Sequence, residues 1–87
     1  MRVVPGFIVR EIAGETVAIP TGESAHRLSG LVALNGSGKF LFEQLQKEQT
    51  EESLVQAMLE TYEVSAEVAE EDVAEFIKLL KENDMLM

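Results

Sequence analysis

The chain has 87 residues, of which 16 are acidic and seven are lysine or arginine, so its net charge is −9. This length suits one small domain over residues 1–87, which buries roughly three fifths of its unfolded surface and leaves little material for a deep active-site cleft. The sequence has no cysteine, no signal-peptide pattern and no apolar run of membrane-spanning length, which excludes disulfides and thiolate chemistry and predicts a cytoplasmic protein without membrane spans.

Short β-prone runs separated by turn residues fill the chain up to residue 34. We expect a first strand over residues 7–12 and a second over residues 16–19, joined by a tight turn and ended by Pro20. After a polar loop, a third strand is expected over residues 30–34. The sequence therefore predicts a three-stranded antiparallel sheet in the first part of the chain.

The stretch LNGSGKFLFEQL, residues 34–45, has the glycines and the lysine of a phosphate-binding loop. Such a loop needs Gly, four spacer residues, Gly-Lys and then a Ser or Thr whose hydroxyl holds Mg²⁺. Here Ala33 stands where the first glycine is needed and Phe40 stands where the hydroxyl is needed. We therefore exclude a nucleotide site and expect Asn35 to cap a helix instead.

From Asn35 onward the apolar residues recur with the period of a helix. We expect a first helix up to residue 45, a second capped by Thr50, and a third that begins after Ser65 and ends at Asn83. The expected core stripe of the second helix is Leu54, Val55, Met58, Leu59 and Tyr62. Strands followed by helices predict an α+β, winged-helix-like fold.

The third helix carries apolar residues on two faces. Its expected core face consists of Ala69, Val73, Phe76, Ile77 and Leu80. A second stripe lies about 80–100° from the centre of that face and mixes apolar with acidic residues: Val68, Leu79 and Leu86 with Asp72, Glu75 and Glu82. Leu79 then either covers the margin of the core or belongs to one wall of a groove, and the sequence leaves both interpretations open.

The charge is concentrated in the second half of the chain. Residues 1–42 carry three acids and four bases, a net charge of +1, whereas residues 43–87 carry 13 acids and three bases, a net charge of −10. Such a surface repels the phosphates of nucleic acids and suits a basic or neutral partner. Ordinary solvated helix faces would give the same acidic excess.

No group of residues in the sequence has the composition of a catalytic or metal site. The single histidine, His26, lies in the polar loop beside Arg27. Glu70, Glu71 and Asp72 are consecutive on a helix and point in three directions, so they do not form a carboxylate pair. We therefore expect no enzyme activity, no metal and no cofactor.

Three stretches, GFIVREIAGETVAIPTGE, LVALNGSGKFLFEQL and EESLVQAMLETYEVSAEVAEEDVAEFIKLLKENDML, resemble proteins of the PqqD family. The resemblance covers roughly residues 4–87 and is most specific at Leu34-Asn35 followed by Gly38. It departs from the family at Lys39 and Phe42, where related chains often have a small residue and a tryptophan. The resemblance implies a RiPP recognition element, a domain that binds the leader of a ribosomally made precursor peptide and presents it to a modifying enzyme, often a radical S-adenosylmethionine protein.

The resemblance also implies where the leader would bind, as an extra strand beside the third strand and against the third helix. We expect the backbone edge to come from Leu31, Val32, Ala33 and Leu34. Phe76 and Leu79 would form an apolar shelf beside it, and Asp72 and Glu75 would attract a lysine or arginine of the leader.

A winged-helix-like regulatory domain that contacts protein or DNA is the alternative. DNA recognition needs basic residues on the reading helix. The third helix instead carries five acids ahead of its first lysine: Glu67, Glu70, Glu71, Asp72 and Glu75. The charge therefore favours the peptide-binding interpretation without nucleic acid as a partner.

Overall fold

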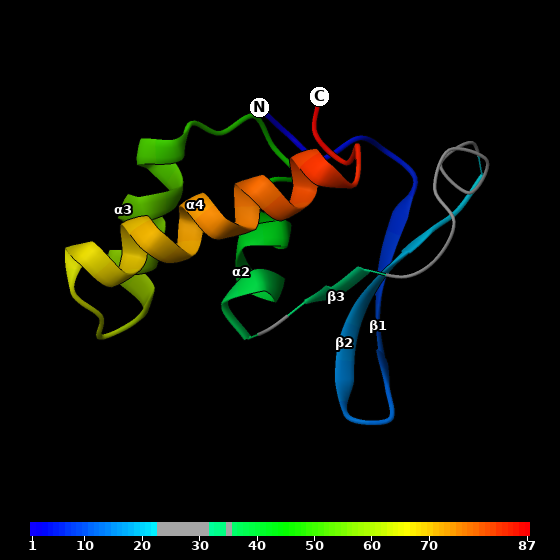
Figure 1. Ribbon diagram of the computed structural model, residues 1–87, viewed down its shortest axis with the longest axis horizontal. Coiled ribbons are helices and arrows are strands. Elements are labelled where there is room, and N and C mark those ends of the chain that lie inside the picture. The colour runs from blue at the N-terminus through cyan, green and yellow to red at the C-terminus, as the bar shows by residue number, and fades with distance from the viewer. Residues whose placement is uncertain (23–31, 35) are drawn as a thin grey trace.

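The computed structural model describes residues 1–22, 32–34 and 36–87. Three strands come first along the chain, β1 (Phe7–Ile12), β2 (Glu15–Pro20) and β3 (Val32–Leu34), and they are followed by the helices α2 (Gly36–Gln44), α3 (Glu51–Thr61) and α4 (Ala66–Glu82) (Figure 1). The predicted α+β fold, a three-stranded antiparallel sheet followed by three helices, is confirmed for this part of the chain. The polar loop with His26, the first residues of the expected third strand and the expected cap Asn35 lie outside the described residues.

The sheet has the order β1-β2-β3, with β2 in the middle and antiparallel to both neighbours. A two-residue turn, Ala13-Gly14, joins β1 to β2. Both residues have positive φ, 53° and 83°, which a tight hairpin turn of this length requires. Ile12 and Glu15 pair directly on either side of it. β2 therefore begins one residue before the predicted start, at Glu15.

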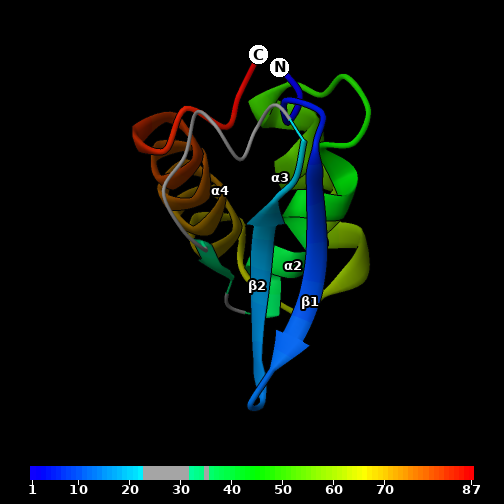
Figure 2. The same ribbon diagram turned by 90° about the vertical axis from the view of Figure 1, so that its right-hand side faces the viewer.

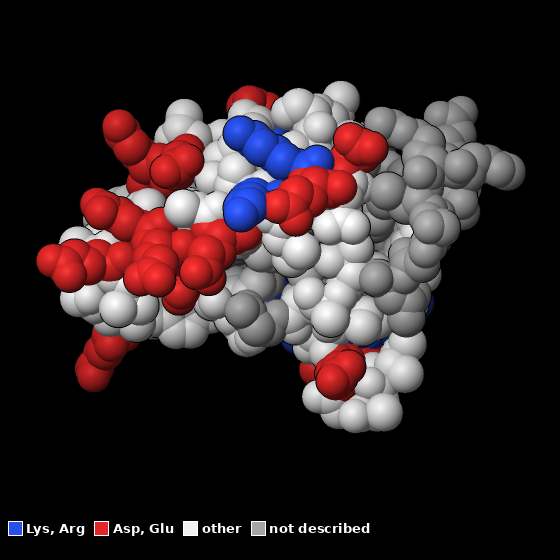
Figure 3. Space-filling model, viewed as in Figure 1, with Lys and Arg blue, Asp and Glu red and all other residues white. Residues whose placement is uncertain are grey.

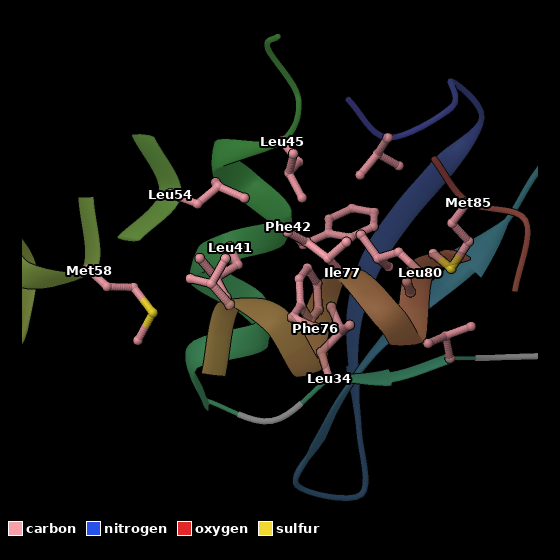
Figure 4. Close-up of a cluster of buried hydrophobic side chains, with 14 of the residues drawn as sticks. Leu34, Leu41, Phe42, Leu45, Leu54, Met58, Phe76, Ile77, Leu80 and Met85 are labelled. Atoms are coloured by element: carbon pink, nitrogen blue, oxygen red, sulfur yellow. The ribbon is translucent and has the colours of Figure 1, made fainter. Parts of the chain in front are cut away.

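The helices pack on one side of the sheet (Figures 1 and 2). The core between the two layers takes Ala18 from β2, Val32 and Leu34 from β3, and the largest buried side chains of the helices (Figure 4). Those with less than 2% exposure include Leu41, Leu54, Met58 and Leu80, with Phe42 at 2%. The five residues expected on the core face of the third helix are all buried in α4: Ala69, Val73, Phe76, Ile77 and Leu80.

The two ends of the chain pair with each other, which sequence reasoning did not predict. Val3 forms an isolated antiparallel bridge with Leu86, and the N–H of Val4 donates to the carbonyl of Met85 at 2.8 Å. The side chain of Met85 is fully buried, and the N–H of Val3 donates to the carbonyl of Leu45 at 2.9 Å. The paired ends thereby hold the C-terminal end of α4 against the end of α2.

The predicted starts of α3 and α4 and the predicted end of α4 are confirmed by their caps. Thr50 accepts a bond from the N–H of Ser53 at 3.0 Å while Ser53 accepts one from the N–H of Thr50 at 2.9 Å, a reciprocal capping box. Ser65 accepts a bond from the N–H of Val68 at the start of α4, and Asn83 ends that helix.

One residue of the expected stripe on α3 does not face the core. Tyr62 follows the last turn of the helix with extended backbone and is 38% exposed. Its ring meets the edge of Phe40 with the two centroids 5.3 Å apart. The prediction that Tyr62 belongs to the core stripe is therefore wrong, because α3 ends before it.

We expect Thr50→Ala to lower the free energy of unfolding by about 1 kcal/mol, because the N–H of Ser53 in the first turn of α3 loses its acceptor, the Thr50 hydroxyl. Urea unfolding followed by circular dichroism measures the loss. Thr61→Ala is the matched control, since Thr61 is exposed in the last turn of the same helix and caps nothing. Equal losses for the two variants would contradict the role of the cap.

Candidate functional site: a groove between the sheet edge and α4

A groove of about 750 Å³ lies between the open edge of the sheet and α4. Its walls come from the tip of the β1–β2 hairpin, from β3, from the first residues of α2 and from one side of α4. Six of the eight residues predicted for peptide binding line it: Ala33, Leu34, Asp72, Glu75, Phe76 and Leu79. Val32 is instead buried in the core at 8% exposure, and Leu31 lies outside the described residues.

The register of the hairpin decides which backbone groups point into this groove. In an antiparallel pair, residues that exchange both hydrogen bonds alternate with residues that exchange none. The pair Ile12–Glu15 closes a two-residue turn and is therefore of the bonded kind. At the other end of the hairpin the N–H of Thr21 donates to the carbonyl of Gly6 at 2.6 Å, which is the bonded pair that the same alternation requires.

The alternation extends from β1 through β2 to β3. Since Val17 directs its N–H and C=O toward β1, its neighbours Thr16 and Ala18 direct theirs toward β3. Thr16 pairs with Leu34 and Ala18 pairs with Val32, so these two residues of β3 use their backbone groups within the sheet. Ala33 lies between them and directs its N–H and C=O away from β2, toward the groove.

The opposite wall is the side of α4 that carries part of the predicted second stripe. Phe76 is 6% exposed and lies beside Leu34 (Figure 4), whereas Leu79 is half-buried and packs against the margin of the core. Leu79 thus both lines the groove and contacts the core, so the two interpretations of this residue are compatible. Val68 and Leu86 of the same stripe do not line the groove.

Carboxylates stand on both sides of the groove. Asp72 and Glu75 come from α4, and Glu15 comes from the hairpin tip. None of the three forms an ion pair with the described part of the chain, where the two side-chain pairs are Lys39–Glu11 and Lys78–Glu82. Figure 3 shows acidic side chains over α3 and the first half of α4 and again at the hairpin tip, with uncharged surface between them.

The part of the groove that comes from the hairpin tip and from the start of α2 was not predicted from the sequence. Glu15 and Thr16 line the groove on one side, and Gly36 and Ser37 close it at the end of β3. A signal for Glu15 was present, because a two-residue turn at Ala13 and Gly14 places it at the start of the strand that pairs with β3. Its position in the groove could not be predicted, because that position depends on the direction in which α4 crosses the edge of the sheet.

Across residues 1–22, 32–34 and 36–87, no three His, Asp or Glu side chains are grouped so that they could hold a metal ion. In the same residues no helix is long and apolar enough to cross a membrane. The groove instead offers a backbone edge, an apolar wall and three carboxylates, which are features of a binding surface.

A family model matches most of the chain. The family model for coenzyme PQQ synthesis protein D, PqqD, matches residues 15–86, which confirms the resemblance read from the sequence. No curated protein sequence matches the chain significantly.

Two solved structures share its fold. One is TbiB1 in complex with the TbiA(beta) leader peptide, which is 20% identical with a TM-score of 0.72, over 99% of this chain and 94% of that one. The other is lasso peptide synthetase B1 complexed with the leader peptide, which is 24% identical with a TM-score of 0.68, over 97% of this chain and 93% of that one.

We expect the amide of Ala33 to exchange with solvent faster than the amides of Val32 and Leu34, because only Ala33 directs its N–H away from β2. Hydrogen–deuterium exchange followed by NMR resolves the three amides individually. Slow exchange at Ala33 together with fast exchange at its two neighbours would contradict this inference, because Ala33 would then direct its N–H toward β2 and its neighbours theirs away from it.

Proposed function

The chain belongs to the PqqD family, and on this premise we propose that it is a non-catalytic peptide chaperone that binds the leader of a ribosomally made precursor peptide. The leader joins the sheet as a further strand beside β3, and the bound peptide is presented to a modifying enzyme of the radical S-adenosylmethionine class. The observation that carries this proposal is the backbone of Ala33, which points into the groove from the edge of the sheet.

An added strand suits this edge because the bonds are made by backbone groups. A peptide residue placed opposite Ala33 in an antiparallel strand accepts a bond from its N–H and donates one to its carbonyl. Such bonds give affinity to many sequences, so side chains on the groove walls must supply the selectivity. Phe76 and Leu79 would supply apolar contact, and Asp72 and Glu75 would attract a basic side chain.

The solved relatives support the proposal. Both TbiB1 and lasso peptide synthetase B1 were solved with leader peptides, and their fold matches nearly the whole of this chain. We also propose that residues 1–87 act as one peptide-recognition domain, because the strands, the helices and both chain ends contribute to one core. The exposed acids of α4 disfavour the alternative in which this helix reads DNA.

We expect Ala33→Pro to weaken binding of leader peptides encoded beside the gene by about five- to tenfold, since proline removes one donor and its ring obstructs the added strand. Isothermal titration calorimetry measures the loss. The sheet itself is retained, because the bonds to β2 come from Val32 and Leu34. Ala33→Val keeps the donor and is the matched control, so a similar loss in both variants would contradict pairing at this residue.

We expect Leu79→Asp to weaken the same peptides by about tenfold or more while unfolding stays cooperative, because a charge replaces the half-buried apolar shelf beside Phe76. Val68→Asp is the control: it adds the same charge to α4 at a position that is 43% exposed and outside the groove. Unchanged affinity in Leu79→Asp would remove this residue from the site.

A further inference from the structure

We infer that the groove selects an extended peptide segment in which a basic residue and an apolar residue stand two positions apart. This inference rests on the proposed function and deepens it by naming the side-chain pattern of the bound segment. It follows from three properties of the site: the direction of the backbone groups of Ala33, the path of α4 along β3, and the order of the side chains on α4.

The first property fixes which peptide side chains face α4. Val32 and Leu34 direct their side chains into the core, and Ala33 directs its exposed methyl group to the opposite face of the sheet. A peptide residue paired with Ala33 lies on that opposite face too, because side chains directly opposite each other share a face. The peptide residues just before and just after it therefore point toward the helical layer, where α4 forms the wall.

The second property is the matching of two spacings. α4 runs alongside β3 with the opposite chain direction, and β3 lies between α4 and β2 (Figures 1 and 2). Four residues of an α-helix rise about 6 Å, and two residues of a strand advance about 6.7 Å. Neighbouring peptide side chains on the helical side are thus spaced like residues four apart on α4.

The third property is the chemistry found at that spacing. Asp72 precedes Phe76 by four residues and Glu75 precedes Leu79 by four, so the wall changes from an acidic pair to an apolar pair within one such step. Glu15 adds a carboxylate from the hairpin tip. One peptide side chain therefore meets carboxylates and the next on the same face meets Phe76 and Leu79.

The spacing of two positions follows from the condition that both peptide side chains face α4. If the basic and the apolar residue were adjacent, one of them would point to the opposite face of the sheet, beside Ala33, and away from α4. An acidic residue in place of the basic one would face three carboxylates without an ion-pair partner among the described residues. The groove thus discriminates by spacing as well as by charge.

The test uses four synthetic eleven-residue peptides with a common threonine-rich frame and blocked ends. Their central residues are Lys-Thr-Leu, Leu-Thr-Lys, Lys-Leu-Thr and Glu-Thr-Leu, and dissociation constants come from NMR titration of the labelled protein. The first two differ in the direction of the bound strand. We expect one of them to bind about tenfold more tightly than the adjacent and the acidic peptides.

Three variants assign the effect to residues. Asp72→Asn combined with Glu75→Gln should erase most of the preference for Lys over Glu. Glu70→Gln combined with Glu71→Gln removes the same charge from α4 outside the groove and should leave that preference in place. Ala33→Pro should weaken all four peptides by a similar factor.

The outcomes separate the inference from the proposed function. Binding that depends on Ala33 but is equal for all spacings and charges overturns the inference and leaves peptide capture standing. The inference is also overturned if Glu70→Gln with Glu71→Gln reduces the preference for Lys over Glu as much as Asp72→Asn with Glu75→Gln does. Net charge would then explain the preference. If neither these peptides nor the natural leaders bind in a way that depends on Ala33, both the inference and the proposed function are wrong.

Discussion

The alternation of bonded and non-bonded pairs across the sheet is the constraint on which the site depends. It is set by the two-residue turn at Ala13 and Gly14, whose positive φ angles match the twist of the strands. A turn with one residue more would shift the alternation, and Ala33 would then direct its backbone groups toward β2. The backbone edge that β3 presents to the groove is thus fixed by a turn in another part of the sheet.

The second wall depends on the contacts that α4 makes along its buried face and beyond its last turn. Its buried face packs on α3 and α2, and the pairing of Val3 with Leu86 joins the chain ends beyond its last turn. With Met85 fully buried, the C-terminal end of α4 cannot move without opening the core. The groove therefore has two walls positioned by the same core, which limits the ordering that a bound peptide has to induce.

Local signals were sufficient to predict the order of the elements and six of the residues that line the groove. Thr50 and Ser65 are caps whose side chains bond backbone groups three residues away, so their effect is visible in the sequence. Tyr62 was misassigned because helical spacing continues past the residue where α3 ends. The pairing of Val3 with Leu86 and the position of Glu15 opposite α4 join residues far apart along the chain, and no local pattern encodes such contacts.

Because the edge is short, a bound peptide would depend on side-chain contacts as well as on backbone hydrogen bonds. β3 has three residues, of which one offers its backbone groups to the groove, so bonds to the sheet alone give modest affinity. They do fix the register, because a shift by one residue would move every peptide side chain to the other face. α4 can then distinguish peptides by what stands at alternate positions. Under the proposed function, the acidic surface around it would raise the local concentration of basic segments before they dock, so the charge that disfavours nucleic acid would also favour this encounter.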